Sequence, residues 1–175
     1  MNLFSVLLLG HLLADFPFQT PAILRWKFRG GIYLLPHIAV HTAVMALLIE
    51  NPLQQWPLIT IIIVSHFIID WFKVAQGCRM KEGYSFILDQ SAHILILWLA
   101  TTLTGVTSHQ FAFQYLPYIL ALAVMSAFFM YLNVIKTEIE ATPVPAVVGK
   151  YAFVMSKTAG WLAVFSLLVS IQFLR

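Results

Sequence analysis

Residues 65–73 read SHFIIDWFK and, after a short basic loop, residues 88–93 read LDQSAH. Each stretch places two ionisable side chains four residues apart in an otherwise apolar run, so the two side chains share one face of a helix. An aspartate in the middle of a lipid bilayer costs roughly 2.5 to 3.5 kcal/mol, and more on an isolated helix. Such residues persist where they face the interior of a helical bundle, pair with one another or bind a metal.

The composition is that of an integral membrane protein. Of the 175 residues, 61% are hydrophobic and 10% are charged, and the mean hydropathy is +0.87. Soluble domains usually carry about 25% charged residues, so the composition excludes that class. The net charge of +3 does not indicate nucleic-acid binding, because basic residues of membrane proteins mainly report orientation. The first apolar segment lacks the basic start and the cleavage site of a signal peptide, so we expect a retained helix.

Apolar runs of about 20 residues predict six transmembrane helices. The predicted spans are 2–19, 32–49, 55–72, 85–103, 111–134 and 150–174. Prolines near the predicted starts, such as Pro36 and Pro117, agree with these boundaries. The prediction is therefore an all-α membrane protein that forms a single polytopic domain over residues 1–175.

The first four predicted spans contain an internal repeat. The sequence GHLLADF at 10–16 parallels SHFIIDW at 65–71, and PHIAVH at 36–41 parallels LDQSAH at 88–93. Both pairs of spans would start on the same side of the membrane, so the repeats are predicted to be parallel. The predicted units are a first two-helix repeat at 1–50, a second at 55–104 and a C-terminal helical hairpin at 111–175.

Basic residues are concentrated in the odd-numbered connections between predicted spans. We interpret them chiefly as topology signals, which predicts these connections in the cytoplasm and both termini outside. The ionisable pairs would then lie near the cytoplasmic face, roughly 5 to 15 Å inside the membrane boundary. The basic residues of the first and third connections are Arg25, Lys27, Arg29, Lys73, Arg79 and Lys81.

Four predicted spans together carry eight side chains that can ligate a metal, as in carboxylate-rich helical bundles. They are His11, Asp15, His37, His41, His66, Asp70, Asp89 and His93. Imidazoles and carboxylates in this mixture suit zinc, iron or manganese, as one or two ions. Gln19 and Gln90 are predicted to support the ligands or to contact substrate. Lys73 could neutralise Asp70, hold an anionic headgroup, or simply reach the membrane surface.

Four motifs of this chain stand out together: HLLADF-x2-Q at 11–19, H-x3-H at 37–41, H-x3-D-x2-K at 66–73 and DQ-x2-H at 89–93. In this combination the chain resembles a bacterial family of small polytopic membrane proteins that is catalogued only as a domain of unknown function. The resemblance implies a bacterial inner-membrane protein but no established activity. No residue role is carried over from it.

The pattern favours a membrane-embedded metal-dependent hydrolase. Its substrate would be lipid-like or amphipathic, with a reactive end that reaches the cytoplasmic third of the bilayer. Metal-bound water would be the nucleophile and one of Asp15, Asp70 or Asp89 the general base, with Lys73 a further catalytic candidate. Di-iron oxidative chemistry is an alternative reaction for the same ligands.

Two other classes of function are consistent with the same residues. A transporter for a divalent metal or a proton-coupled solute would explain repeats around a polar site, although the outer halves of the first four spans offer almost no polar path. A non-catalytic membrane subunit, with charges paired for assembly, would bind no metal. The last two predicted spans lack the ionisable pairs and are predicted to be a scaffold or the contact face of a homo-oligomer.

Overall fold

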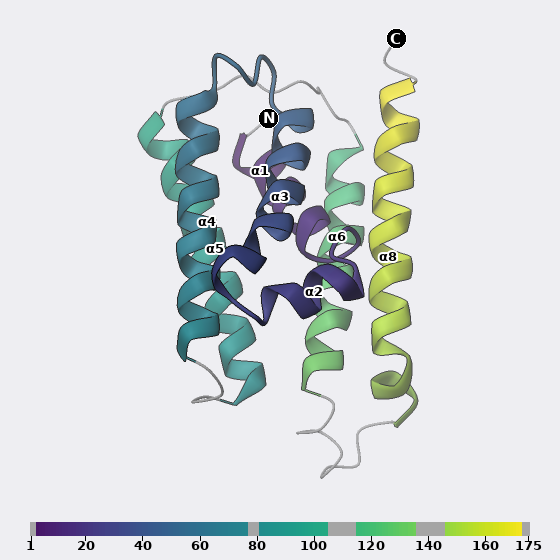
Figure 1. Ribbon diagram of the computed structural model, residues 1–175. Coiled ribbons are helices and arrows are strands. Elements are labelled where there is room, and N and C mark those ends of the chain that lie inside the picture. The colour runs from purple at the N-terminus through teal and green to yellow at the C-terminus, as the bar shows by residue number, and fades with distance from the viewer. Residues whose placement is uncertain (1–2, 77–80, 105–114, 136–145, 173–175) are drawn as a thin grey trace.

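The protein is helical throughout the part that the computed structural model describes, which comprises residues 3–76, 81–104, 115–135 and 146–172. These residues form seven α-helices and one 3-10 helix (Figure 1). The elements are α1 (Leu3–Asp15), α2 (Pro21–Lys27), the 3-10 helix η1 (Gly31–Leu34), α3 (Leu35–Leu48), α4 (Trp56–Gln76), α5 (Glu82–Thr104), α6 (Leu116–Val134) and α8 (Ala146–Gln172). The predicted all-α class is confirmed, while Arg79 and the predicted start of the fifth span lie outside the described residues.

Five helices are long and apolar enough to cross a membrane. They are η1 with α3 (Gly31–Leu48), α4, α5, α6 and the Tyr151–Ser170 part of α8. Helix α1 is shorter, since its 13 residues rise only about 20 Å, whereas the hydrocarbon core of a bilayer is about 30 Å thick. The crossing of the membrane by α1, which is the first predicted span, and hence the total of six spans stay predictions, as does the internal repeat.

Successive long helices alternate in direction along one axis (Figure 1). Helix α1 lies inside the bundle, where it contacts α3, α5, α6 and α8. Helices α4 and α5 pack together on one side of the bundle, and α6 and α8 pack together on the other (Figure 1). Helix α2 and η1, which connect α1 to α3 along the chain, run across the bundle. We call the end at which α4 ends and α5 begins the lower end, as it is drawn in Figure 1, and the opposite end the upper end.

Prolines and one capping hydroxyl mark the helix starts. Thr20 precedes α2 and accepts a hydrogen bond from the backbone N–H of Ile23 at 3.3 Å, and Pro21 is the first residue of that helix. Pro36 and Pro117 lie in the first turns of α3 and α6. Proline is tolerated there because the first N–H groups of a helix have no partner within it. Helix α2 itself was not predicted, because its seven residues are too few to show a helical period.

Helices α4 and α5 each bury one narrow stripe of residues. The buried residues of α4 are Leu58, Ile62, His66 and Asp70. The corresponding residues of α5 are Gly83, Asp89, His93, Leu97 and Ala100. From Leu58 to Asp70 and from Asp89 to Ala100 the spacing is three or four residues, which keeps each run on one face, so the ionisable side chains continue the apolar stripe toward the lower end. The outward faces are largely apolar, as expected for helices that contact lipid.

A cluster of apolar side chains fills the upper half of the bundle, and we call it the upper core. It packs α1, α3, α4 and α5 together above the ionisable residues. Its buried members are Leu3, Leu7, Met45, Ile49, Leu58, Ile62, Leu97 and Ala100. The upper core therefore places buried apolar side chains between the ionisable residues and the upper end.

The hairpin of α6 and α8 is joined by a pair of buried serines. Ser126 Oγ donates to the backbone carbonyl of Ser156 at 2.7 Å, and Ser156 Oγ donates to the carbonyl of Ser126 at 2.7 Å. Gly160 of α8 is close enough that an added Cβ would lie 2.9 Å from Ser126 Oγ and 3.0 Å from Pro17 Cβ. Small residues thus let α8 approach both α6 and the turn after α1.

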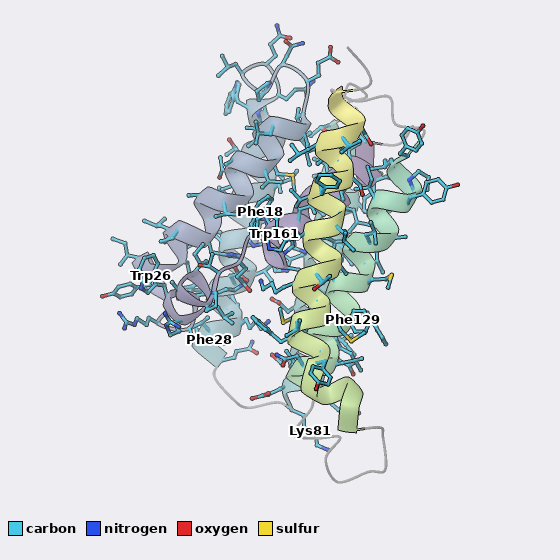
Figure 2. The ribbon with its side chains drawn as sticks, turned by 90° about the vertical axis from the view of Figure 1, so that its right-hand side faces the viewer. Phe18, Trp26, Phe28, Lys81, Phe129 and Trp161 are labelled. Atoms are coloured by element: carbon cyan, nitrogen blue, oxygen red, sulfur yellow. The ribbon has the colours of Figure 1, made fainter. Side chains whose placement is uncertain are left out.

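Helix α8 also supports the end of α1. Lys157 Nζ donates to the backbone carbonyl of Gln19 at 2.8 Å and to that of Phe16, both of which follow the last residue of α1. The rings of Phe18 and Trp161 meet edge to face with centroids 5.5 Å apart, whereas Trp26 and Phe28 point outward from the α2 side (Figure 2). The C-terminal hairpin therefore holds the turn that leads from α1 to α2, while its predicted role in homo-oligomer formation stays a prediction.

Candidate metal centre

All eight predicted ligands are buried and converge inside the bundle. Their side chains are at most 6% exposed, and two come from each of α1, α3, α4 and α5. His66 and His93 lie near the midpoints of α4 and α5, and Asp70 and Asp89 lie one turn nearer the lower end. The cluster lies farther from the lower ends of these two helices than predicted, because α4 continues to Gln76 and α5 already begins at Glu82.

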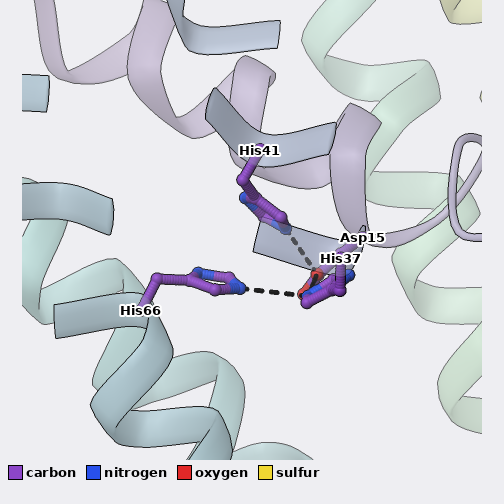
Figure 3. A group of neighbouring side chains, drawn as sticks. All are labelled: Asp15, His37, His41 and His66. Carbon is purple, nitrogen blue, oxygen red and sulfur yellow. Dashed lines mark hydrogen bonds and ion pairs between the residues drawn. The ribbon is translucent and has the colours of Figure 1, made fainter. Parts of the chain in front are cut away.

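Four of the ligands form a compact group, which we call the Asp15 group (Figure 3). Asp15, His37, His41 and His66 each offer one ligand atom, and these atoms lie within 4.8 Å of one another. Asp15 Oδ1 is 2.9 Å from His41 Nε2 and 3.3 Å from His37 Nε2, and the Nε2 atoms of His37 and His66 are 3.1 Å apart. Ligand atoms about 2.0 to 2.1 Å from a tetrahedral ion are about 3.3 Å from one another. These three distances are close to those between the ligand atoms of one metal ion, so the group could hold one ion.

A second group, the Asp70 group, shares His66 with the first. It consists of His66, Asp70 and His93. His66 Nε2 lies 3.4 Å from Asp70 Oδ2, and His93 Nε2 lies 3.9 Å from Asp70 Oδ1. His93 Nδ1 is 2.8 Å from the backbone carbonyl of Asp89, which accepts its proton and turns Nε2 toward the group. Within the described part of the chain, His93 Nε2 has no hydrogen-bond partner.

The two glutamines that were predicted to support the ligands contact them. Gln90 Nε2 donates to Asp15 Oδ2 at 3.0 Å, and Gln90 Oε1 lies 3.2 Å from His11 Nε2. Gln19 Nε2 donates to His37 Nδ1 at 3.3 Å, and His37 Nε2 faces the Asp15 group. Such partners fix the orientation of a ligand. His11 is itself outside both groups, although its Nε2 is 3.6 Å from Asp15 Oδ2.

Lys73 pairs with Asp89, not with Asp70 as the sequence suggested. Lys73 Nζ donates to Asp89 Oδ2 at 2.6 Å across the α4–α5 contact. The other oxygen of Asp89 has no hydrogen-bond partner among the described residues. Asp89 belongs to neither metal-binding group, so it is a carboxylate beside the ligands with one free acceptor.

Lys27 is part of the cluster, although its place in the first basic connection predicted chiefly a topology role, with steering of phosphate as an alternative. Its side chain is buried, and Nζ lies 2.6 Å from Asp70 Oδ1 and 3.2 Å from His37 Nε2. Burial alone would lower the pKa of this ammonium, but the carboxylates of Asp70 and Asp15 raise the pKa above its ordinary value. Lys27 is therefore a buried cation. The sequence signal that could have found it is the Thr20-Pro21 helix start, which turns the chain back toward the bundle.

The balance of charges and hydrogen bonds fits a bound cation. Three aspartates and two lysines give the cluster a net charge of −1 when the imidazoles are neutral. Uncompensated charge and unpaired acceptors are costly in an apolar interior. Unpartnered atoms in the described residues include His41 Nδ1, His93 Nε2 and Asp89 Oδ1. A divalent ion would change the net charge from −1 to +1, so the three carboxylates would offset three of the four positive charges then present.

A cleft of about 340 Å³ connects the cluster with the lower end of the bundle. Its polar side is lined by Asp15, Gln19, Lys27, Lys73, Asp89 and Gln90. Its apolar side includes Phe16, Phe86 and Met130, and residues near the lower helix ends, such as Glu82 and Val134, complete its rim. The cleft thus offers a polar inner end beside the ligands and an apolar wall along α5 and α6.

The fold and the buried cluster define a helical protein of the multi-pass membrane type with His and Asp groups that could hold a metal ion. Residues 3–136 match a family described as "Protein of unknown function (DUF3307)", and the chain belongs to this family. The resemblance to a domain of unknown function is thereby confirmed. No curated protein and no solved structure matches the chain. The matched segment contains every residue of the cluster and ends before α8.

Proposed function

We propose that this protein is a membrane-embedded metal-dependent hydrolase that acts on a lipid-like or amphipathic substrate. The observation that carries the proposal is the Asp15 group, whose four ligand atoms lie within 4.8 Å of one another inside an apolar bundle. Three imidazoles and one carboxylate are typical donors to one ion, and here they come from three different helices.

The ion would be held by Asp15, His37, His41 and His66. Three imidazoles and one carboxylate suit zinc, iron or manganese. Zinc with four protein ligands would have to accept a fifth ligand in order to bind water. Iron and manganese commonly take more than four ligands and would keep an open position. The identity of the metal therefore bears on the reaction.

The position of the cleft favours an enzyme over a transporter. The cleft reaches the cluster from the lower end, whereas the upper core fills the other half of the bundle with apolar side chains. A transporter that works by alternating access needs a second route to the same site. The buried side chains of the upper core are apolar, so they would not line such a route.

The lining of the cleft supports an amphipathic substrate. Ammonium, carboxylate and amide groups surround its inner end, and Phe16, Phe86 and Met130 offer contacts for an acyl or alkyl chain. Ligand sites commonly combine an apolar wall with a few converging polar groups. The reactive group of the substrate would then lie beside the ligands, and its chain would lie along α5 and α6.

Asp89 is the carboxylate that we assign as general base. It lies outside both metal-binding groups, keeps an unpartnered oxygen and lines the cleft. A bound divalent ion would polarise the substrate and acidify a water molecule. The oxygen of that water would add to a carbonyl or phosphoryl centre while Asp89 takes its proton, and the proton would pass to the leaving oxygen as the ester bond breaks. Lys73, 2.6 Å from Asp89, would position this carboxylate.

We place the protein in the bacterial inner membrane, as the family resemblance implies, and the distribution of basic residues supports an orientation with both termini outside. In that orientation the lower end, the rim of the cleft and the connection between α4 and α5 face the cytoplasm. The substrate would enter from the cytoplasmic leaflet.

The proposal is tested with purified protein reconstituted into vesicles of bacterial polar lipids and supplied with zinc, iron(II) or manganese. We expect metal-dependent release of a lipid hydrolysis product, detected by mass spectrometry. Asp89→Asn should abolish release while metal content is kept, and Glu82→Gln, which changes another carboxylate of the cleft, should retain it. Metal flux across the vesicle membrane without any hydrolysis would contradict the proposal and indicate a transporter.

A further inference from the structure

The two metal-binding groups overlap at a single nitrogen atom. His66 Nε2 lies 3.1 Å from His37 Nε2 in the Asp15 group and 3.4 Å from Asp70 Oδ2 in the Asp70 group. A neutral imidazole nitrogen has one lone pair and binds one metal ion at a time. Two ions cannot both use the full set of ligands. The Asp15 group has four ligands and the Asp70 group three, so the shared nitrogen favours an ion in the Asp15 group.

A cation of the protein already occupies the Asp70 group. Lys27 Nζ lies 2.6 Å from Asp70 Oδ1, and both side chains are buried. The same Nζ is 3.2 Å from His37 Nε2. A divalent ion on Asp70 would meet this ammonium at short range in an apolar interior, where repulsion between like charges is strong. Lys27 therefore opposes a second metal ion at Asp70.

The charges of the cluster also favour a single metal ion. With three aspartates, two lysines and neutral imidazoles the net charge is −1. One divalent ion brings the net charge to +1, whereas two bring it to +3 in the interior of a helical membrane bundle. A net charge of +3 is much more costly than one of +1, because the free-energy penalty of burying charge rises steeply with the magnitude of that charge.

We propose that the site binds one divalent ion, held by Asp15, His37, His41 and His66, and that the ammonium of Lys27, fixed on Asp70, is its second cation. This rests on the proposed function, since it concerns the same metal centre. Lys27 also lines the cleft, so its positive charge faces the space assigned to substrate. In hydrolases with two metal ions the second ion stabilises the developing negative charge on oxygen, and Lys27 has the position to supply that charge here.

The inference predicts a metal stoichiometry and the residues on which it depends. Elemental mass spectrometry of the full chain, purified without chelator or polyhistidine tag, should find one equivalent of zinc, iron or manganese. Asp15→Asn should reduce this to less than a fifth. The double variant Lys27→Met/Asp70→Asn, which removes the buried pair together, should still bind one equivalent. Joint removal avoids leaving either charge buried without a partner.

A second measurement separates the charge of Lys27 from its contribution to packing. Lys27→Met should bind zinc at least tenfold more tightly in competition with a chelator, because a positive charge beside the ion has been removed. Lys27→Arg keeps the charge and should leave the affinity within threefold of that of the unsubstituted protein. Equal affinity in all three proteins would overturn the role of Lys27 as second cation.

The outcomes distinguish this inference from the proposed function. Two equivalents in the unsubstituted protein, with one lost in Lys27→Met/Asp70→Asn, would establish a dinuclear site and overturn the inference while the proposed function stands. Loss of all metal in the double variant would also overturn it, because Asp70 would then be a ligand of the single ion. Absence of metal from folded, unsubstituted protein would overturn both.

Discussion

Two regions of the bundle bury polar side chains in different ways. In the C-terminal hairpin, Ser126 and Ser156 each donate a hydrogen bond to the backbone carbonyl of the other at 2.7 Å, so both hydroxyls are satisfied. In the His and Asp cluster, Asp89 Oδ1 and His93 Nε2 have no hydrogen-bond partner among the described residues. Neutral, fully paired groups join two helices, whereas charged groups with free acceptors favour a cation.

The comparison suggests a division of labour within the chain. Helices α1, α3, α4 and α5 carry the proposed ligands, and the α6–α8 hairpin packs against α1. Lys157 links the two regions, because it extends from α8 to the backbone carbonyls after α1. Substitutions in the two regions should therefore separate stability from metal binding.

The largest effect should come from breaking the Lys27–Asp70 ion pair. Asp70→Ala leaves the buried ammonium of Lys27 without its partner, and we expect a loss of about 3 to 5 kcal/mol in the free energy of unfolding. Unfolding in mild detergent, followed by circular dichroism, measures it. As a control, Lys27→Met/Asp70→Asn should recover more than half of this loss. A cost below about 1 kcal/mol for Asp70→Ala would show that the pair is not buried as described.

A smaller loss of stability is expected when Lys157, which links the two regions, is replaced. Lys157→Met removes the hydrogen bonds to the carbonyls of Phe16 and Gln19, which should cost about 1 to 3 kcal/mol of stability. Metal affinity should fall as well, because Asp15 lies at the end of the same helix. Chelator competition measures the affinity. The matched variant Lys81→Met, at an exposed lysine, should change neither property.

Replacement of the serine pair should lower the stability of the protein without changing its metal content. The double variant Ser126→Ala/Ser156→Ala removes two neutral hydrogen bonds together and should cost about 1 to 2 kcal/mol. Its metal content should equal that of the unsubstituted protein, because neither serine contacts a ligand. A loss of metal in this variant would break the division between supporting and ligand-bearing helices.

The least perturbing experiment tests the orientation of the cleft. Cys78 lies in the connection between α4 and α5, outside the described residues, and the cleft rim includes Glu82 at the start of α5. In oriented membrane vesicles an impermeant thiol reagent should label Cys78 from the cytoplasmic side only. Labelling from the outside would place the cleft opening on the other face of the membrane.

Much of the cluster could be predicted from the sequence because helical geometry is local. A spacing of four residues fixes two side chains on one face, and alternating spans bring such pairs to similar depth. The contact between Asp15 of α1 and His41 of α3, at 2.9 Å, follows from this reasoning. The long helices were predicted for the same reason, since each apolar run is long enough to be recognised by itself.

The remaining contacts depend on how separate segments meet. Lys27 reaches Asp70 only because α2 turns across the bundle, and no periodicity within the sequence reports such a turn. Lys73 pairs with Asp89 because α4 and α5 are antiparallel neighbours, although Asp70 is nearer along the chain. Tertiary packing therefore determines which aspartate pairs with each of the two lysines.

The most direct test of the central claim is the metal content of folded protein purified in mild detergent without chelator or polyhistidine tag, measured beside His41→Gln and His11→Gln. We predict one equivalent of zinc, iron or manganese in the unsubstituted protein, its loss in His41→Gln, and its retention in His11→Gln, since His11 lies outside both groups. A well-folded, unsubstituted protein that contains no metal, and takes none up when zinc, iron(II) and manganese are supplied, would contradict the account.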